Sequence, residues 1–319
     1  MLVFSSMITT TYAQKNQLII PGIYPSKAIR IIVGSSPGGG TDISTRLIMN
    51  KVMERSGHTF IIDDIPGANG VIATDMVARL APDGYSLLAT SNSSLVSSLL
   101  VIRKSYDVRT AFEPIALFTS QPYILAVANS LPVNNIKDFF AYAKNKPGEL
   151  NYASSGVGST SHVGMEQMNL LAGIKMQHVP YKGIGPGIND MLADRIQVLF
   201  GSVIAVMPYA KIGRVKALAE GGLKRSSLLP DIPSISEEVL PGFEMTGWYG
   251  LMAPEGTSST IINYLNRIIV QAVNSTDIVQ KLSSNGAEAP QSNPAQFKEL
   301  MLREFDKVEK LKESGINLE

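Results

Sequence analysis

The chain has 319 residues, of which 45% are hydrophobic and 17% are charged, and this balance is enough to bury a full core. Disordered and collagen-like chains are therefore excluded. With 28 basic and 27 acidic side chains the formal net charge is +1, so we expect no nucleic-acid partner. The absence of cysteine removes disulfides, thiolate catalysis and cysteine-ligated metals.

The N-terminal residues 2–13 (LVFSSMITTTYA) are mildly apolar and uncharged, like the back half of a secretory signal peptide. The basic segment that opens such a peptide is missing. A weakly hydrophobic, disordered N-terminus explains the same residues. We favour export, with the signal truncated in this sequence.

Short β-branched runs alternate along the chain with longer segments of helical period, which is typical of βα units around a mostly parallel sheet. The predicted fold class is therefore α/β. The expected strands are residues 29–33, 60–63, 86–90, 124–128, 150–153, 177–180, 196–201, 215–219 and 248–253. The run at 198–209 is interpreted as a buried strand that enters a loop. Turn-forming residues at 120–122 and 240–243 fit either crossings between lobes or surface loops.

Three apolar stripes at helical spacing predict the core faces of helices. The stripes are Ile72, Met76 and Leu80, then Ile261, Leu265, Ile268 and Ala272, and finally Phe297, Met301, Phe305 and Val308. The last of these helices is otherwise highly charged, so we expect it to lie on the surface with one side packed.

The strand at 29–33 runs into a glycine-rich loop, residues 34–42 (GSSPGGGTD), and then into a segment of helix-forming composition. Glycines let backbone N–H groups converge, and a helix start adds about half a positive charge, so this order of elements builds an anion site. Its spacing is neither that of a nucleotide P-loop nor that of a dinucleotide fold. A tight turn with Thr41 or Asp42 as an ordinary helix cap explains the same residues.

A second loop of this kind, residues 154–162 (SSGVGSTSH), follows the strand at 150–153, and a third, at 91–94, follows the strand at 86–90. Neutral donors in these loops are Ser155, Ser159, Thr160, Ser161 and Asn92. Each loop alone is more simply a cluster of helix caps. Together, polar loops at the carboxyl ends of strands point to one crevice. Because neither glycine loop contains arginine or lysine, we expect reversible capture through neutral donors, helix ends and water.

Catalytic and metal-binding patterns are not evident in the sequence. His162 stands beside Ser161 without an orienting acid, and the spacing of His58, His162 and His178 is not that of metal ligands. Asp63 and Asp64 alternate across a strand, which directs them to opposite faces. We therefore expect neither catalysis nor a cofactor. An enzyme acting on a small anion remains the alternative from another class, because fold alone never establishes function.

Several motifs, taken together and in order, resemble those of the extracytoplasmic solute receptors of tripartite tricarboxylate transporters, the Bug or TctC family. These motifs are residues 24–26 with 37–42, 66–70 (PGANG), 81–85 (APDGY), 150–154 (LNYAS), 178–183 (HVPYKG) and 248–254 (WYGLMAP). The resemblance covers essentially residues 24–319. It implies a two-lobed Venus flytrap fold like that of type II periplasmic binding proteins. One lobe would comprise 24–120 and 244–319, and the other 121–243.

The resemblance further implies that a monomer without a cofactor holds a small organic carboxylate between its lobes and delivers it to the membrane subunits of a transporter. The contacts implied in the first lobe are Ser35, Gly39, Gly40, Thr41, Asp42 and Asn92. Those implied in the second lobe are Ser155, Ser159, Thr160, Ser161, Tyr181 and Ser202.

Two residues depart from the family pattern. Members often carry an aromatic residue in place of Ser35 and an aspartate in place of Gly201. Without that aspartate a ligand amine loses its partner, so we expect a dicarboxylate, hydroxy acid or aromatic acid instead of an amino acid. A receptor that reports to a signalling partner, without transport, stays open at this point.

Overall fold

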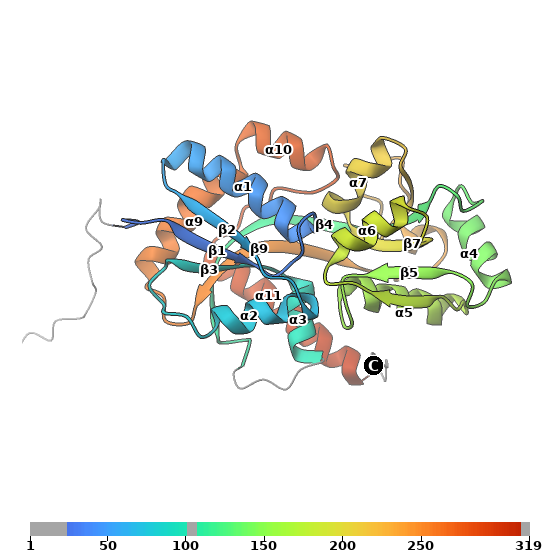
Figure 1. Ribbon diagram of the computed structural model, residues 1–319, viewed down its shortest axis with the longest axis horizontal. Helices are drawn as coiled ribbons and strands as arrows, with labels where there is room; N and C mark the ends of the chain where they lie inside the picture. The colour runs from blue at the N-terminus through green and yellow to red at the C-terminus, as the bar shows by residue number, and fades with distance from the viewer. Residues whose placement is uncertain (1–23, 101–106, 314–319) are drawn as a thin grey trace, which may run out of the picture.

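The computed structural model describes residues 24–100 and 107–313. Residues 2–13 and the side chain of Val308, on which sequence predictions fall, lie outside this description. Two α/β lobes stand side by side and are joined by long strands (Figure 1). The predicted α/β class and two-lobed architecture are thus confirmed. No helix within 24–100 and 107–313 is long and apolar enough to cross a bilayer.

The strands form one continuous sheet that runs through both lobes in the order β2-β1-β3-β9-β4-β7-β5-β6, with β8 also paired to β4. The first lobe contains β1 (Ile29–Val33), β2 (Phe60–Asp64) and β3 (Ser86–Ser91). The second lobe contains β5 (Asn151–Ser154), β6 (Gln177–Pro180), β7 (Val198–Ser202) and β8 (Val215–Glu220). Parallel pairing of β1 with β2 and β3, and of β5 with β6 and β7, agrees with the βα pattern of the sequence.

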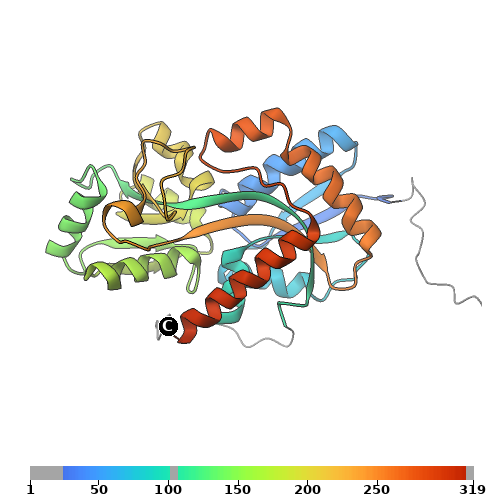
Figure 2. The same ribbon diagram turned by 180° about the vertical axis from the view of Figure 1, so that it is seen from behind.

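Two long antiparallel strands, β4 (Phe112–Ala128) and β9 (Thr246–Pro254), run from one lobe into the other (Figure 2). β4 pairs with β9 as far as Pro122 and with β7 from Tyr123 onward. The residue limits of the lobes stay a prediction.

The sequence predicted only residues 124–128 of β4, and the structure corrects this. Of the two explanations for residues 120–122, the structure has a strand that passes between the lobes and not a surface loop. Two prolines, which cannot donate a ladder hydrogen bond, hid the first half of the strand. Pro114 is accommodated where the register with β9 shifts, and Pro122 is the last residue paired with β9.

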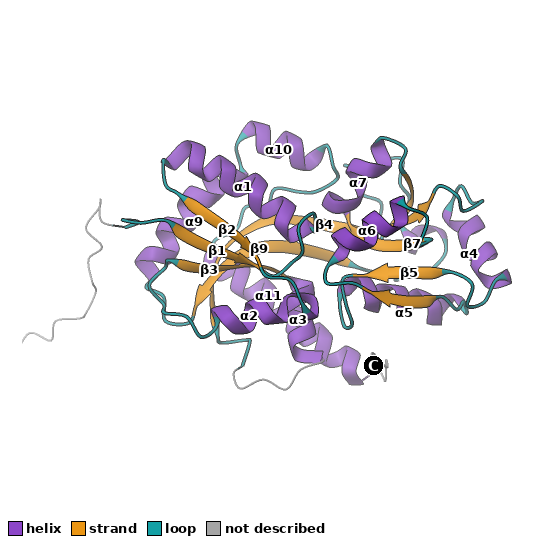
Figure 3. Ribbon diagram, in the orientation of Figure 1, coloured by secondary structure: helices purple, strands orange, loops and turns teal. Residues whose placement is uncertain are grey.

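Helices cover the sheet on both sides (Figure 3). The first lobe has α1 (Gly40–Ser56), the short η1 (Ala68–Gly70), α2 (Val71–Val77), α3 (Asn92–Leu100), α9 (Ser259–Val273), α10 (Thr276–Ser283) and α11 (Pro294–Glu313). The second has α4 (Ile136–Asn145), α5 (Thr160–Ala172), α6 (Ile184–Leu192), α7 (Val203–Lys211) and α8 (Ile235–Glu238). The loop expected after residue 201 is therefore helix α7. Its first five residues are all buried, so the segment lacks the period of an amphipathic helix.

The predicted stripes of α9 and α11 lie in the core, since Leu265, Ala272, Phe297, Met301 and Phe305 are all buried. The stripe predicted for α2 is wrong. Ile72 and Met76 are 50% and 37% exposed, and the buried side chains of this helix are instead Val71, Ala73, Thr74 and Val77. The helix follows a left-handed residue at Gly70, which sets a different face toward the sheet.

The side chain of Phe297 anchors α11 to β9. Its ring lies 4.9 Å from that of Trp248 in an edge-on arrangement. Gly250 leaves the space that the ring occupies, because a Cβ there would lie 2.6 Å from Phe297 Cζ. This contact supports the strand that continues from one lobe to the other.

We predict that Phe297→Ala lowers the free energy of unfolding by about 3–5 kcal/mol, because it leaves a cavity in a fully buried site. Leu302→Ala on the same helix serves as the control, since Leu302 is 40% exposed and should change stability by less than about 1 kcal/mol. Urea denaturation followed by circular dichroism measures both. Equal effects of the two substitutions would contradict this account of the packing.

Candidate functional site

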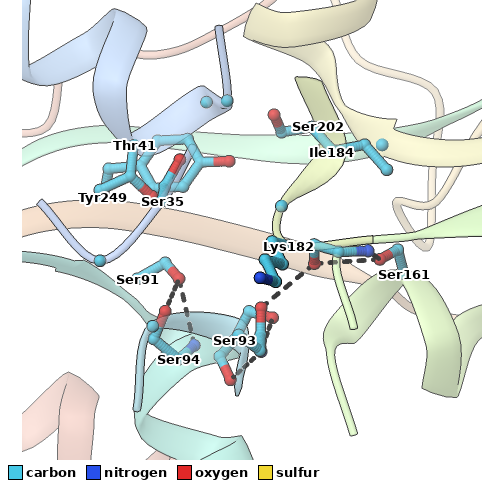
Figure 4. A pocket seen from close by; sticks show the side chains of 18 of the residues that line it. Ser35, Thr41, Ser91, Ser93, Ser94, Ser161, Lys182, Ile184, Ser202 and Tyr249 are labelled. Carbon is cyan, nitrogen blue, oxygen red and sulfur yellow. Dashed lines mark hydrogen bonds between the residues drawn. The ribbon is translucent and has the colours of Figure 1, made fainter. Parts of the chain in front are cut away.

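A pocket of about 40 Å³ lies between the lobes, where the carboxyl ends of β1, β3, β5, β6 and β7 meet (Figure 4). Of the residues predicted from the sequence, it is lined by Ser35, Gly39, Gly40, Thr41, Ser155, Ser161 and Ser202. Loops from both lobes thus come together on one small volume, as expected for strand ends in an α/β sheet.

Asp42 holds the first glycine loop in shape. Its side chain was predicted to contact the ligand, but it does not line the pocket. Its carboxylate accepts a hydrogen bond from the backbone N–H of Gly38 at 2.9 Å and forms an ion pair with Arg46. Gly38 has a φ of +77°, which favours glycine. Asp42 is therefore buried as a clamp of the loop. Gly39 and Gly40 line the pocket beside this clamp.

Asn92 and Ser159 also differ from the prediction, because each side chain bonds inside the protein. Only Ser159 does so as a helix cap, the alternative that the sequence suggested. The Asn92 amide donates to the Thr246 carbonyl at 3.2 Å and accepts from the Trp248 N–H at 3.4 Å, which ties α3 to β9. The Ser159 hydroxyl accepts from the N–H of His162 at 3.2 Å and caps α5. Neither side chain lines the pocket.

Thr160 and Tyr181 lie next to the pocket without lining it. The Tyr181 hydroxyl donates to Asp190 at 2.7 Å, away from the cleft. The backbone N–H of Thr160 donates to the Ser93 hydroxyl at 2.9 Å, which is a contact between the two lobes.

The structure adds lining residues to which the sequence analysis assigned no role, chief among them Asn69, Lys182 and Tyr249. All three lie inside the motifs at 66–70, 178–183 and 248–254 that carried the family resemblance. Asn69 has a left-handed backbone with a φ of 50°. Its amide donates to Ser93 at 3.0 Å, and its oxygen accepts from Ser155 of the other lobe at 3.1 Å.

Neutral hydroxyl groups form one wall of the pocket. Burial raises the pKa of Tyr249 well above its ordinary value and that of Tyr123 to about 12, so both phenols keep their protons. The hydroxyl of Ser202 is buried beside the hydroxyl of Tyr249, with which it interacts. A buried hydroxyl of this kind is available to a ligand or a water molecule.

The two lobes are closed on each other around the pocket. The Ser97 hydroxyl donates to the Gly158 carbonyl at 2.8 Å, next to the contact between Ser155 and Asn69. On the other side, the start of α6 packs against the first glycine loop, and a Cβ at Gly185 would lie 2.6 Å from the Pro37 carbonyl oxygen. Closure therefore requires a residue without a side chain at this point.

Two stacked histidines support the second glycine loop from below. The rings of His162 and His178 lie 4.0 Å apart at 12°. The N–H of Gly158 donates to Nδ1 of His162 at 3.1 Å, so this ring nitrogen carries no proton. Burial lowers the pKa of His162. Burial, together with His162, lowers the pKa of His178 to about 4. Both rings are thus neutral at pH 7.

Among the described residues, the remaining titratable groups form no metal site. No three ligating side chains come together within residues 24–100 and 107–313. Asp63 and Asp64 point to opposite sides as predicted, since Asp63 pairs with Arg30 and Asp64 with Arg46.

Comparison with known proteins shows which family the chain belongs to. The model of the tripartite tricarboxylate transporter family receptor, TctC, matches residues 44–316. The chain belongs to the TctC family. This confirms the resemblance inferred from the motifs and makes the protein a member of a family of solute-binding receptors.

Solved structures of similar proteins share the whole fold. A Rhodopseudomonas palustris protein with adipate is 30% identical, with a TM-score of 0.86 over 91% of this chain and 97% of that one. MatC from the same organism with bound malate is 28% identical, with a TM-score of 0.84 over 90% and 99%. The periplasmic binding protein BugD is 29% identical, with a TM-score of 0.86 over 92% and 99%.

We predict that the stability of the protein decreases as the pH falls from about 6.5 toward about 4, the ordinary and the lowered pKa of His178. In this range the unfolded chain binds protons that the folded chain excludes, so the free energy of unfolding rises with pH. The measurement is urea denaturation at a series of pH values. His178→Phe keeps a stacked ring that cannot titrate and should give a shallower slope. An identical slope in that variant would contradict the assignment.

Proposed function

We propose that this protein is a periplasmic receptor that captures a small organic carboxylate between its lobes and delivers it to the membrane subunits of a tripartite tricarboxylate transporter. The ligand would be a di- or tricarboxylate, a hydroxy acid or an aromatic acid, held by the pocket between the two glycine loops. Membership of the TctC family supports this role. The relatives with adipate and with malate support an organic acid as the ligand.

The observation that carries the proposal is the convergence of helix N-termini on the pocket. Five helices of eight residues or more, α1, α3, α5, α6 and α7, begin beside it, and residues at or next to each start line it. Each start brings a partial positive charge to the edge of the pocket. Among the described lining residues none is acidic, so nothing opposes an anion there.

The buried hydroxyl of Ser202 is a second, independent feature of the same site. It lines the pocket at the start of α7 and lies beside the Tyr249 hydroxyl. Tyr249 adds a phenol that keeps its proton. Ser35 places no aromatic ring, and Gly201 no carboxylate, at their own positions in the wall. The missing carboxylate favours an acid that carries no amine.

The experiment that tests the function is a thermal-shift screen of the purified protein against organic acids, followed by titration calorimetry. We expect at least one di- or tricarboxylate, hydroxy acid or aromatic acid to raise Tm, and NMR to recover that acid unchanged. Binding of aspartate or glutamate with no binding of simple dicarboxylates would contradict the proposed ligand class. Formation of a product would favour an enzyme instead.

We expect Gly40→Val to abolish the ligand-induced rise in Tm. A Cβ at this position would lie 2.5 Å from the Ser202 hydroxyl and 2.6 Å from Cζ of the Tyr249 ring, so the side chain would fill the pocket. Ser259→Val places the same side chain at the exposed first residue of another helix, α9, and is the matched control.

Circular dichroism of the ligand-free variants checks that both are folded. A Gly40→Val protein that still responds to the acid as the wild type does would place the ligand outside this pocket.

A further inference from the structure

Lys182 is the single charged side chain among the described residues that line the pocket. It lies in the turn between β6 and α6, outside both glycine loops. The absence of arginine and lysine from those loops therefore did not reveal it. No carboxylate within residues 24–100 and 107–313 pairs with its amino group. The nearest acidic residue in sequence, Asp190, is engaged by Tyr181 and Arg195.

The backbone of this turn is fixed in place from both lobes. The N–H of Tyr181 donates to the Ser154 carbonyl at 3.1 Å, and its hydroxyl is bound to Asp190 at 2.7 Å. Gly183 has a φ of +116° and packs so close to Ser36 of the first lobe that a Cβ would lie 3.0 Å from the Ser36 nitrogen. The Lys182 side chain therefore starts from a defined point at the edge of the closed pocket.

The pocket has two kinds of anion-binding group. At one side Thr41 and Ser202 lie at the starts of α1 and α7, where the donors are neutral. Lys182 lies apart from them, with its amino group turned toward the side where Ser93 lies (Figure 4). Lys182 is exposed at the edge of the pocket and no acidic lining residue competes for it, so its amino group is available to a second carboxylate of a ligand.

We propose that Lys182 binds the second carboxylate of a dianionic ligand and so makes the protein select diacids over monoacids of the same chain length. The inference rests on the proposed function and deepens it by assigning the specificity for the second charge to one side chain. A salt-bridged hydrogen bond is about twice as strong as a neutral one, so the choice between the two ligand classes would depend mainly on this contact.

The test is titration calorimetry with matched pairs of acids, namely succinate with butanoate, glutarate with pentanoate and adipate with hexanoate. For the wild type we expect diacid binding to exceed monoacid binding by about tenfold or more. Lys182→Met should weaken diacid binding by a similar factor and leave monoacid binding unchanged, and Lys182→Arg should retain the preference. Lys175→Met, at the opposite end of β6, removes the same charge from an exposed site and is the matched control.

Salt gives a second readout. Added NaCl should weaken diacid binding to the wild type more than to Lys182→Met, because it screens an exposed charge pair. If Lys182→Met leaves the ratio of diacid to monoacid affinity unchanged while the wild type still binds the acids, the inference is overturned and the proposed function stands. If the wild type binds none of these six acids and none of the acids in the thermal-shift screen, the proposed function is overturned and the inference with it.

Discussion

The antiparallel pairing of β4 with β9 is the constraint on which the rest of the structure depends. Both strands pass from one lobe to the other, so the sheet continues through the whole molecule. The pairing also places Tyr123 and Tyr249 beneath the interlobe pocket. α11 holds β9 from behind through Phe297, so a packing contact remote from the pocket supports its floor. The geometry of the site is thus set by a two-stranded ribbon and not by the loops alone.

Much of the fold could be predicted because strands in a βα pattern are short, β-branched and bounded by glycine or proline. The predictions failed where a local rule was overridden by tertiary context. The prolines of β4 argued against a strand, yet one occupies a register shift and the other the end of a pairing. In α2, Ile72 and Met76 have the spacing of a core stripe but are exposed. The glycine turn before the helix determines which face meets the sheet.

The candidate site was predictable to the extent that it consists of backbone. Glycine-rich loops between a strand and a helix are visible in the sequence, and both line the pocket. The sequence does not distinguish a side chain that faces the pocket from one that caps a helix or clamps a loop. Asp42, Asn92 and Ser159 all act within the protein. Lys182 and Asn69 enter from separate turns, and only the closed arrangement of the lobes brings them together.

The continuity of the ribbon has a practical consequence. Motion between the lobes must bend or twist two paired strands, because β4 and β9 connect the lobes directly. Under the proposed function, the angle between the lobes would change with occupancy of the cleft. The chain also lacks cysteine. One thiol introduced on each lobe would therefore be a unique attachment point, and a dye pair placed there would turn the molecule into an optical reporter of its own cargo.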